Sequence, residues 1–157
     1  MKDTSSELHL DHSPIHLLHR AGQFAGDVFS EEMNDGKLTP RQYAILLTVA
    51  QNEGISQTGL VNRTGIDRST LADIVRRMLK KGFLQRQRTK RDARAYAVSL
   101  TEAGWAALET AQPAAMHADK RILSVLSPKE RGEFLDTLVK IVHAMDGPET
   151  VKANGGG

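Results

Sequence analysis

A short stretch in the middle of the chain combines two closely spaced helix signals with two strand signals. Ser56 and Asp67 each stand where a helix N-cap is expected, and the turn Thr64-Gly65 separates the two helices. Two helices joined by a short turn containing glycine form a helix-turn-helix. Residues 83–88 and 95–100 then have the composition of strands around a polar connection. The stretch therefore predicts a winged helix-turn-helix with a two-stranded wing.

The same region holds most of the positive charge of the chain. Residues 61–94 contain eleven Lys or Arg and three Asp, a net charge of +8, whereas the whole chain carries only +2 and its remainder −6. A basic patch of this kind is typical of nucleic-acid binders. The alternative interpretation is a solvated basic helix face. The helix-turn-helix and this charge together favour double-stranded DNA as the partner. A winged helix that served only as a protein-interaction module would have no need of the charge.

Composition excludes several other classes of protein. The chain of 157 residues has no cysteine, which excludes disulfides and thiolate zinc sites, and it has no run of eighteen apolar residues that could cross a membrane. The N-terminus lacks the apolar stretch of a secretory signal, so we expect a cytoplasmic protein. Neither a phosphate-binding glycine loop nor a catalytic His or Ser motif occurs. We therefore expect neither an enzyme nor a bound cofactor.

Further helix signals flank the winged region. Ser13-Pro14, Thr39-Pro40 and Ser127-Pro128 each place a capping residue before proline, and a long helix begins at Thr101 with Pro113 as an expected kink. The first helix and the last two carry apolar stripes wider than a small winged domain can cover, which predicts a homodimer. We expect a mainly α fold with a small two-stranded β wing, divided into a disordered N-terminal segment (1–12), dimerisation helices (13–36 and 101–146), the DNA-binding domain (37–100) and a disordered tail (147–157).

The helix that follows Asp67 is the expected DNA-recognition element. Its apolar stripe, which includes Leu71 and Val75, must face the core, so the opposite side faces outward. Side chains in the first turn of such a helix reach base edges in the major groove, and those near its far end meet phosphates. The candidate DNA contacts are Arg68, Ser69, Thr70, Asp73, Arg76, Arg77 and Lys80.

The connection between the two strands supplies further candidate contacts. Lys90, Arg91 and Arg94 make this tip basic, so it can follow the phosphate backbone or enter a narrow minor groove. Asp92 can hold the guanidinium of Arg94, or serve as a turn residue, or do both.

Three motifs resemble those of the MarR family of bacterial transcription regulators. They are residues 38–43 (LTPRQY), residues 65–71 (GIDRSTL) and the wing signature Asp92-Ala93-Arg94 followed by residues 99–104 (SLTEAG). The resemblance covers residues 13–146. It implies a homodimer that reads a pseudo-palindromic operator and represses until a small molecule lowers its affinity for DNA. The tip departs from the commonest family pattern, because Lys90 and Arg91 stand where proline and acidic residues are usual.

The resemblance also implies an effector site between the dimerisation helices and the winged domain. The N-terminal part is similar to regulators of aromatic-acid catabolism, whose effectors include aromatic carboxylates and their coenzyme A thioesters. An arginine there can pair with an acid group while aromatic rings stack on the effector, and packing in the core or interface is the alternative role. The candidate ligand contacts are His16, His19, Arg20, Phe24, Tyr43 and Trp105.

A histidine cluster near the N-terminus raises the alternative of a metal-responsive regulator. His12, His16 and His19 have a spacing that stacks side chains on one helix face, with His9 and Asp11 nearby. The expected helix start after Ser13 removes His12 from that face, however. We therefore expect no metal site, and interface packing, ligand contact or simple exposure remain open for these histidines.

Overall fold

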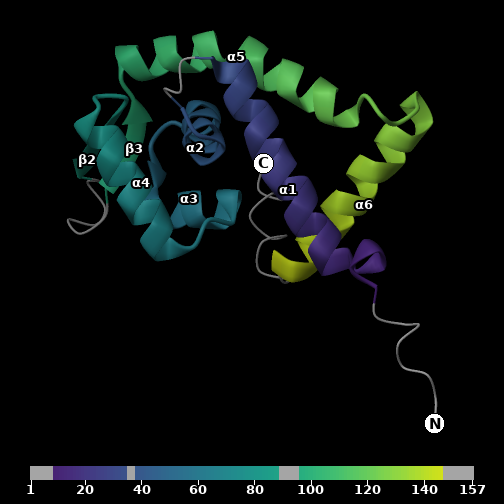
Figure 1. The fold of residues 1–157 in the computed structure, drawn as a ribbon. Coiled ribbons are helices and arrows are strands. Elements are labelled where there is room, and N and C mark those ends of the chain that lie inside the picture. The colour runs from purple at the N-terminus through teal and green to yellow at the C-terminus, as the bar shows by residue number, and fades with distance from the viewer. Residues whose placement is uncertain (1–8, 35–37, 89–95, 147–157) are drawn as a thin grey trace.

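A computed structural model of the chain describes residues 9–34, 38–88 and 96–146. It is mainly helical, with long helices beside a small domain that carries a three-stranded antiparallel sheet (Figure 1). The expected fold class is confirmed. The elements in chain order are a 3-10 turn η2 (Leu10–His12), α1 (Pro14–Met33), α2 (Pro40–Gln51), β1 (Ile55–Ser56), α3 (Gln57–Thr64), α4 (Arg68–Lys80), β2 (Leu84–Arg88), β3 (Tyr96–Leu100), α5 (Glu102–Leu123) and α6 (Pro128–Asp146).

Capping side chains set the helix starts where the sequence places them. The Ser13 hydroxyl accepts a hydrogen bond from the backbone of His16 at the start of α1. At α2, Thr39 and Gln42 form a reciprocal capping box, with N···O distances of 3.2 and 3.1 Å. Each cap satisfies backbone N–H groups that have no partner inside the helix. These local bonds explain why the predicted starts of the helices are confirmed.

A single glycine makes the turn of the helix-turn-helix. Gly65 ends α3 with φ of +69°, a left-handed conformation that costs glycine little because it has no Cβ. Two residues later Asp67 caps α4, accepting a hydrogen bond from the Thr70 backbone at 2.9 Å. The two helices therefore meet across a turn short enough to hold their relative angle.

The sheet contains one strand more than the two-stranded wing expected. Its order is β1-β3-β2, with Leu84 opposite Leu100 and Arg88 opposite Tyr96 in the β2–β3 hairpin. On the other side of β3, Ile55 pairs with Val98. The sequence showed only the cap at Ser56, because a strand of two residues is too short to display alternation and forms only where β3 supplies its partner.

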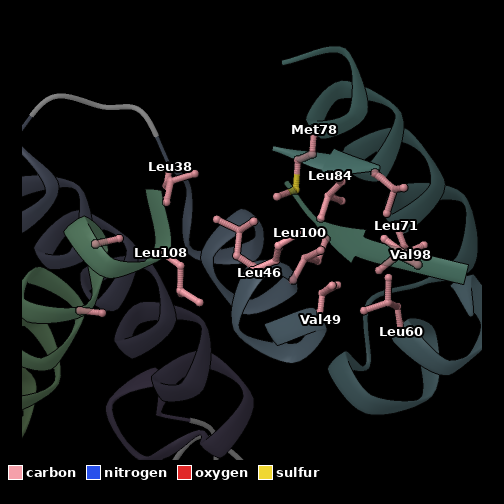
Figure 2. Packing of buried hydrophobic residues seen from close by; sticks show 14 of the residues in the cluster. Leu38, Leu46, Val49, Leu60, Leu71, Met78, Leu84, Val98, Leu100 and Leu108 are labelled. Carbon is pink, nitrogen blue, oxygen red and sulfur yellow. The ribbon is translucent and has the colours of Figure 1, made fainter. Parts of the chain in front are cut away.

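The core of the winged domain lies where the helices meet the sheet. Figure 2 shows Leu71 and Met78 of α4 facing Leu84, Val98 and Leu100 of the sheet, all of them almost fully buried. Leu46 and Val49 of α2 and Leu60 of α3 complete this core. The buried side of α4 is thereby fixed, and with it the side that faces solvent.

The start of α5 is pressed against the turn that precedes β2. The backbone N–H of Thr101 donates to the carbonyl of Phe83 at 3.1 Å, and the Thr101 hydroxyl caps α5 by accepting from Gly104 at 3.0 Å. A Cβ on Gly104 would lie 2.1 Å from the Phe83 carbonyl oxygen. This close approach gives a physical reason for the Thr-x-x-Gly that follows the wing, since only glycine fits there.

The long helices connect this domain to an apolar surface. α5 continues as one helix across Pro113, and Figure 1 shows it bending near its middle. Arg121 of α5 bridges to Glu31 and Glu32 of α1 at 2.9 and 3.1 Å, which ties these helices together. No residue of α6 is buried. Its exposed apolar side chains are Phe134, Leu135, Val139, Ile141, Val142 and Met145.

Candidate nucleic-acid interface

The outward face of α4 carries the predicted contacts. Leu71, Val75 and Met78 are buried, and the helical period turns the polar residues to the opposite side. Five of the candidates on α4 are exposed, namely Arg68, Ser69, Arg76, Arg77 and Lys80. The other two, Thr70 and Asp73, are half-buried. The structure therefore gathers the seven α4 candidates on one helix, with the cationic side chains facing solvent.

Hydrogen bonds order the first turn of α4. The Ser69 hydroxyl donates to the Asp67 carboxylate at 2.9 Å, and Arg68 donates to the Thr58 hydroxyl of α3 at 3.3 Å. Hydrogen bonds from Thr70 and Ser69, with a smaller effect of the Arg41 charge, lower the pKa of Asp67 to about 2. The carboxylate is charged at neutral pH, so it holds the first turn in place while the polar edges of Arg68 and Ser69 stay at the surface.

One carboxylate sits among the cations further along α4. Asp73 pairs with Arg76 through one oxygen and with Arg77 through the other, the second at 3.1 Å. Both arginine side chains are more than two-thirds exposed, whereas that of Asp73 is 37% exposed. The pairs hold the two guanidinium groups close to the helix surface and offset part of their charge.

The strands of the wing add a second basic group that the sequence analysis did not single out. The guanidinium carbons of Arg86 and Arg88 on β2 lie 4.8 and 5.9 Å from the ring centre of Tyr96 on β3. A hydrogen bond from Arg88, together with its charge, lowers the pKa of Tyr96. The signal was the alternation of Leu84, Arg86 and Arg88, which puts them on one face. The wing-tip candidates Lys90, Arg91, Asp92 and Arg94 lie outside the described residues.

The predicted ligand contacts form two separate groups. Arg20 lies over the Phe24 ring at 5.6 Å, and both residues are exposed on α1. Tyr43 instead packs on Phe29 with ring centres 5.8 Å apart, and burial, aided by the charge of Asp119, raises its pKa. His16 is half-buried, while His19 and Trp105 are exposed.

A cavity of about 490 Å³ is lined by other residues. It is bounded by Glu32 and Met33 at the end of α1, by Phe83, and by a row of alanines on α5 beside Thr110. None of the six ligand candidates lines it. The lining of this cavity and the predicted ligand contacts therefore have no residue in common.

Near the N-terminus, His12, His16 and His19 lie on two separate elements. Residues 10–12 form η2, and α1 begins only at Pro14, so His12 does not share the α1 face of His16 and His19. Within the three described ranges, no three His, Cys, Asp or Glu side chains are grouped closely enough to hold a metal ion. In the same part of the chain, none of the helices is both long enough and apolar enough to span a membrane.

Comparison with known proteins agrees with this geometry. A family model described as the MarR family matches residues 38–96. The HTH-type transcriptional repressor NicR of Pseudomonas putida is 30% identical over 148 residues, which span 90% of this chain and 94% of NicR. The match to NicR therefore extends beyond the winged domain into the helices that flank it.

Solved structures show the same architecture. Bordetella bronchiseptica BpsR, whose DNA binding is described as regulated by 6-hydroxynicotinic acid, is similar with a TM-score of 0.82 and 28% identity over 86% of this chain and 96% of that one. The repressor CouR, bound to a 23-mer DNA duplex, is similar with a TM-score of 0.78 and 27% identity over 85% of this chain and 94% of its own. The chain belongs to the MarR family of winged-helix transcriptional regulators.

Proposed function

We propose that this protein is a homodimeric repressor that binds a pseudo-palindromic DNA operator and is released by a small aromatic acid or its coenzyme A thioester. The observation that carries the proposal is the outward face of α4, where five polar or cationic side chains are exposed opposite a buried apolar stripe. The capped first turn presents Arg68 and Ser69 to base edges. Lys80 at the far end suits a phosphate.

Residues of both α4 and the wing contribute in this proposal. Arg68, Ser69, Thr70, Asp73 and Arg76 read bases, with Arg77 and Lys80 nearer the backbone. The tip residues Lys90, Arg91 and Arg94 engage phosphates or the minor groove, with Asp92 orienting Arg94. The similarity to CouR, a repressor solved on a DNA duplex, supports this mode of binding.

Dimerisation is supported by the apolar surface that the monomer leaves exposed. Val139 and Val142 of α6 are 50% and 54% exposed, and Ile15 at the start of α1 is 72% exposed. Figure 1 shows α6 and the N-terminal end of α1 on the same side, away from the sheet. Burial of such side chains contributes roughly 25 cal/mol per Å². A two-fold dimer also suits an operator with two half-sites.

The effector class is supported by chemistry on α1 and by the relatives. Arg20 beside the Phe24 ring offers a cation and an aromatic face within 5.6 Å, which suits an aromatic carboxylate. BpsR is described as controlled by 6-hydroxynicotinic acid, and NicR is named as a repressor. Half-buried His16 and Tyr43, with exposed His19 and Trp105, are the other proposed contacts.

The test is fluorescence anisotropy of a labelled duplex taken from immediately upstream of the protein's own gene, with a shuffled duplex of equal length as control. We expect the protein to bind the upstream duplex tightly and in a salt-sensitive way. We also expect one member of a panel of aromatic acids and their thioesters to release the protein from this duplex. Arg20→Gln should abolish release without changing DNA affinity. Equal binding to both duplexes would contradict sequence-specific autoregulation. Binding that no compound weakens would contradict the effector class.

A further inference from the structure

Arg86 and Arg88 differ from Arg76, Arg77 and Arg121 in the partner that holds them. Arg76 and Arg77 share Asp73, and Arg121 bridges to two glutamates. In the described ranges, no carboxylate forms an ion pair with Arg86 or Arg88, which instead lie against the Tyr96 ring. Among the residues that the structure describes, the Tyr96 ring orders these two guanidinium groups and no carboxylate offsets their charge.

Strand register places this pair on the side of the sheet that faces α4. Leu84, Arg86 and Arg88 alternate along β2 and so share one face. Leu84 on that face is buried beside Met78 of α4 (Figure 2). The two arginines continue the same face beyond the buried core, where both are exposed.

From this geometry we infer that Arg86, Arg88 and Tyr96, here called the wing stem, form a phosphate-binding site that contacts the DNA backbone beside the groove entered by α4. The inference rests on the proposed function, because it assumes that α4 faces DNA. Arg86 and Arg88 are the contacting residues. Tyr96 is a positioning residue that acts through them.

The chemistry of the wing stem suits phosphate. A guanidinium group presents its N–H donors in a planar fork that matches two phosphate oxygens. A guanidinium group held over the ring has fewer rotamers open to it and still keeps N–H donors for phosphate, although Arg88 also gives one hydrogen bond to Tyr96. Preordering of this kind reduces the entropy lost on binding. The charge added beyond α4 widens the electrostatic footprint without adding base specificity.

The first experiment measures the salt dependence of DNA binding for Arg86→Gln and Arg88→Gln. Each phosphate contact contributes about 0.9 to the slope of log K against log salt concentration. The slope is negative, and we expect each substitution to make it shallower by about that amount. The effect should be the same for the upstream duplex and the shuffled duplex. Lys129→Gln, whose side chain is 86% exposed at the start of α6, is the matched control and should leave the slope unchanged. A wild-type slope in both arginine variants would overturn the inference.

The second experiment tests whether Tyr96 acts through the arginines. Tyr96→Phe keeps the ring and should retain most of the salt slope, whereas Tyr96→Ala should lower it. In the Arg86→Gln/Arg88→Gln background, Tyr96→Ala should cause no further loss. An additional loss there, or equal losses for Phe and Ala, would refute the positioning role. Thermal melting of each variant confirms that the protein compared is folded.

Lys80→Gln separates this inference from the proposed function. If Lys80→Gln lowers the slope and the wing-stem variants do not, α4 binds DNA and the wing stem does not, which overturns only the inference. If the wild-type protein shows no salt-dependent binding to either duplex, both the proposed function and the inference are wrong.

Discussion

The Asp73 carboxylate holds Arg77 at 3.1 Å on the exposed face of α4, and its other oxygen pairs with Arg76. In the proposed complex this negative group repels phosphates, and its ion pairs restrain the two arginines and offset part of their charge. The same carboxylate can accept a hydrogen bond from a cytosine amino group. We therefore propose that Asp73 favours a DNA sequence that offers such a donor over DNA of any sequence.

Replacement of Asp73 by alanine should relax specificity. We expect tighter binding to the shuffled duplex and a steeper salt slope, because Arg76 and Arg77 become free to meet phosphates. Exposed ion pairs contribute little to stability, so the melting temperature should change little. Anisotropy titrations of both duplexes measure the ratio of affinities, and an unchanged ratio would show that Asp73 has no part in specificity.

The Asp67 cap predicts a pH dependence of stability. Its folded pKa is about 2, below the ordinary 3.8. A depressed folded pKa stabilises the protein fully above 3.8, and the contribution disappears as the pH falls through about 2. Asp67→Asn can still cap the helix but does not titrate. The melting temperatures of the wild type and of this variant should therefore converge as the pH falls from 3.8 to about 2. A constant difference between the two melting temperatures down to the lowest pH would contradict the stabilising role of the Asp67 carboxylate.

Gly104 and Gly132 form a matched pair for testing the approach of α5 to Phe83. A Cβ on Gly104 would lie 2.1 Å from the Phe83 carbonyl oxygen, whereas one on Gly132 in α6 would meet nothing within 4 Å. Gly104→Ala should destabilise the fold by about 1–3 kcal/mol through overpacking. Gly132→Ala should stabilise its helix by up to about 1 kcal/mol. Urea unfolding compares the two, and a neutral Gly104→Ala would refute the close contact.

A charge on the exposed face of α6 should separate the protomers. Val142 is 54% exposed in the monomer, and burial of an unpaired aspartate at that position in an interface is costly. Val142→Asp should give monomers in analytical ultracentrifugation and lose most of its DNA affinity, since one winged domain reads only half of a two-fold site. Lys129→Ala serves as the control. A dimeric Val142→Asp would place the interface elsewhere.

Local signals in the sequence determined the helices and the face that α4 turns outward. The caps at Ser13, Thr39, Asp67 and Ser127 act within three residues of themselves, so their bonds can be read from spacing alone. The buried stripe of α4 follows in the same way from the helical period. For this reason the winged helix-turn-helix and its candidate contacts on α4 can be predicted from residue spacing and helical period.

Tertiary structure alone decided the features that depend on residues far apart in the chain. The strand at Ile55–Ser56 exists because β3 pairs with it, and Gly104 is required because Phe83 lies against α5. Likewise, Arg86 and Arg88 meet Tyr96 only through the β2–β3 register. Composition and period describe which side chains share a face. They do not determine which faces meet, because packing between elements selects the register and the partners.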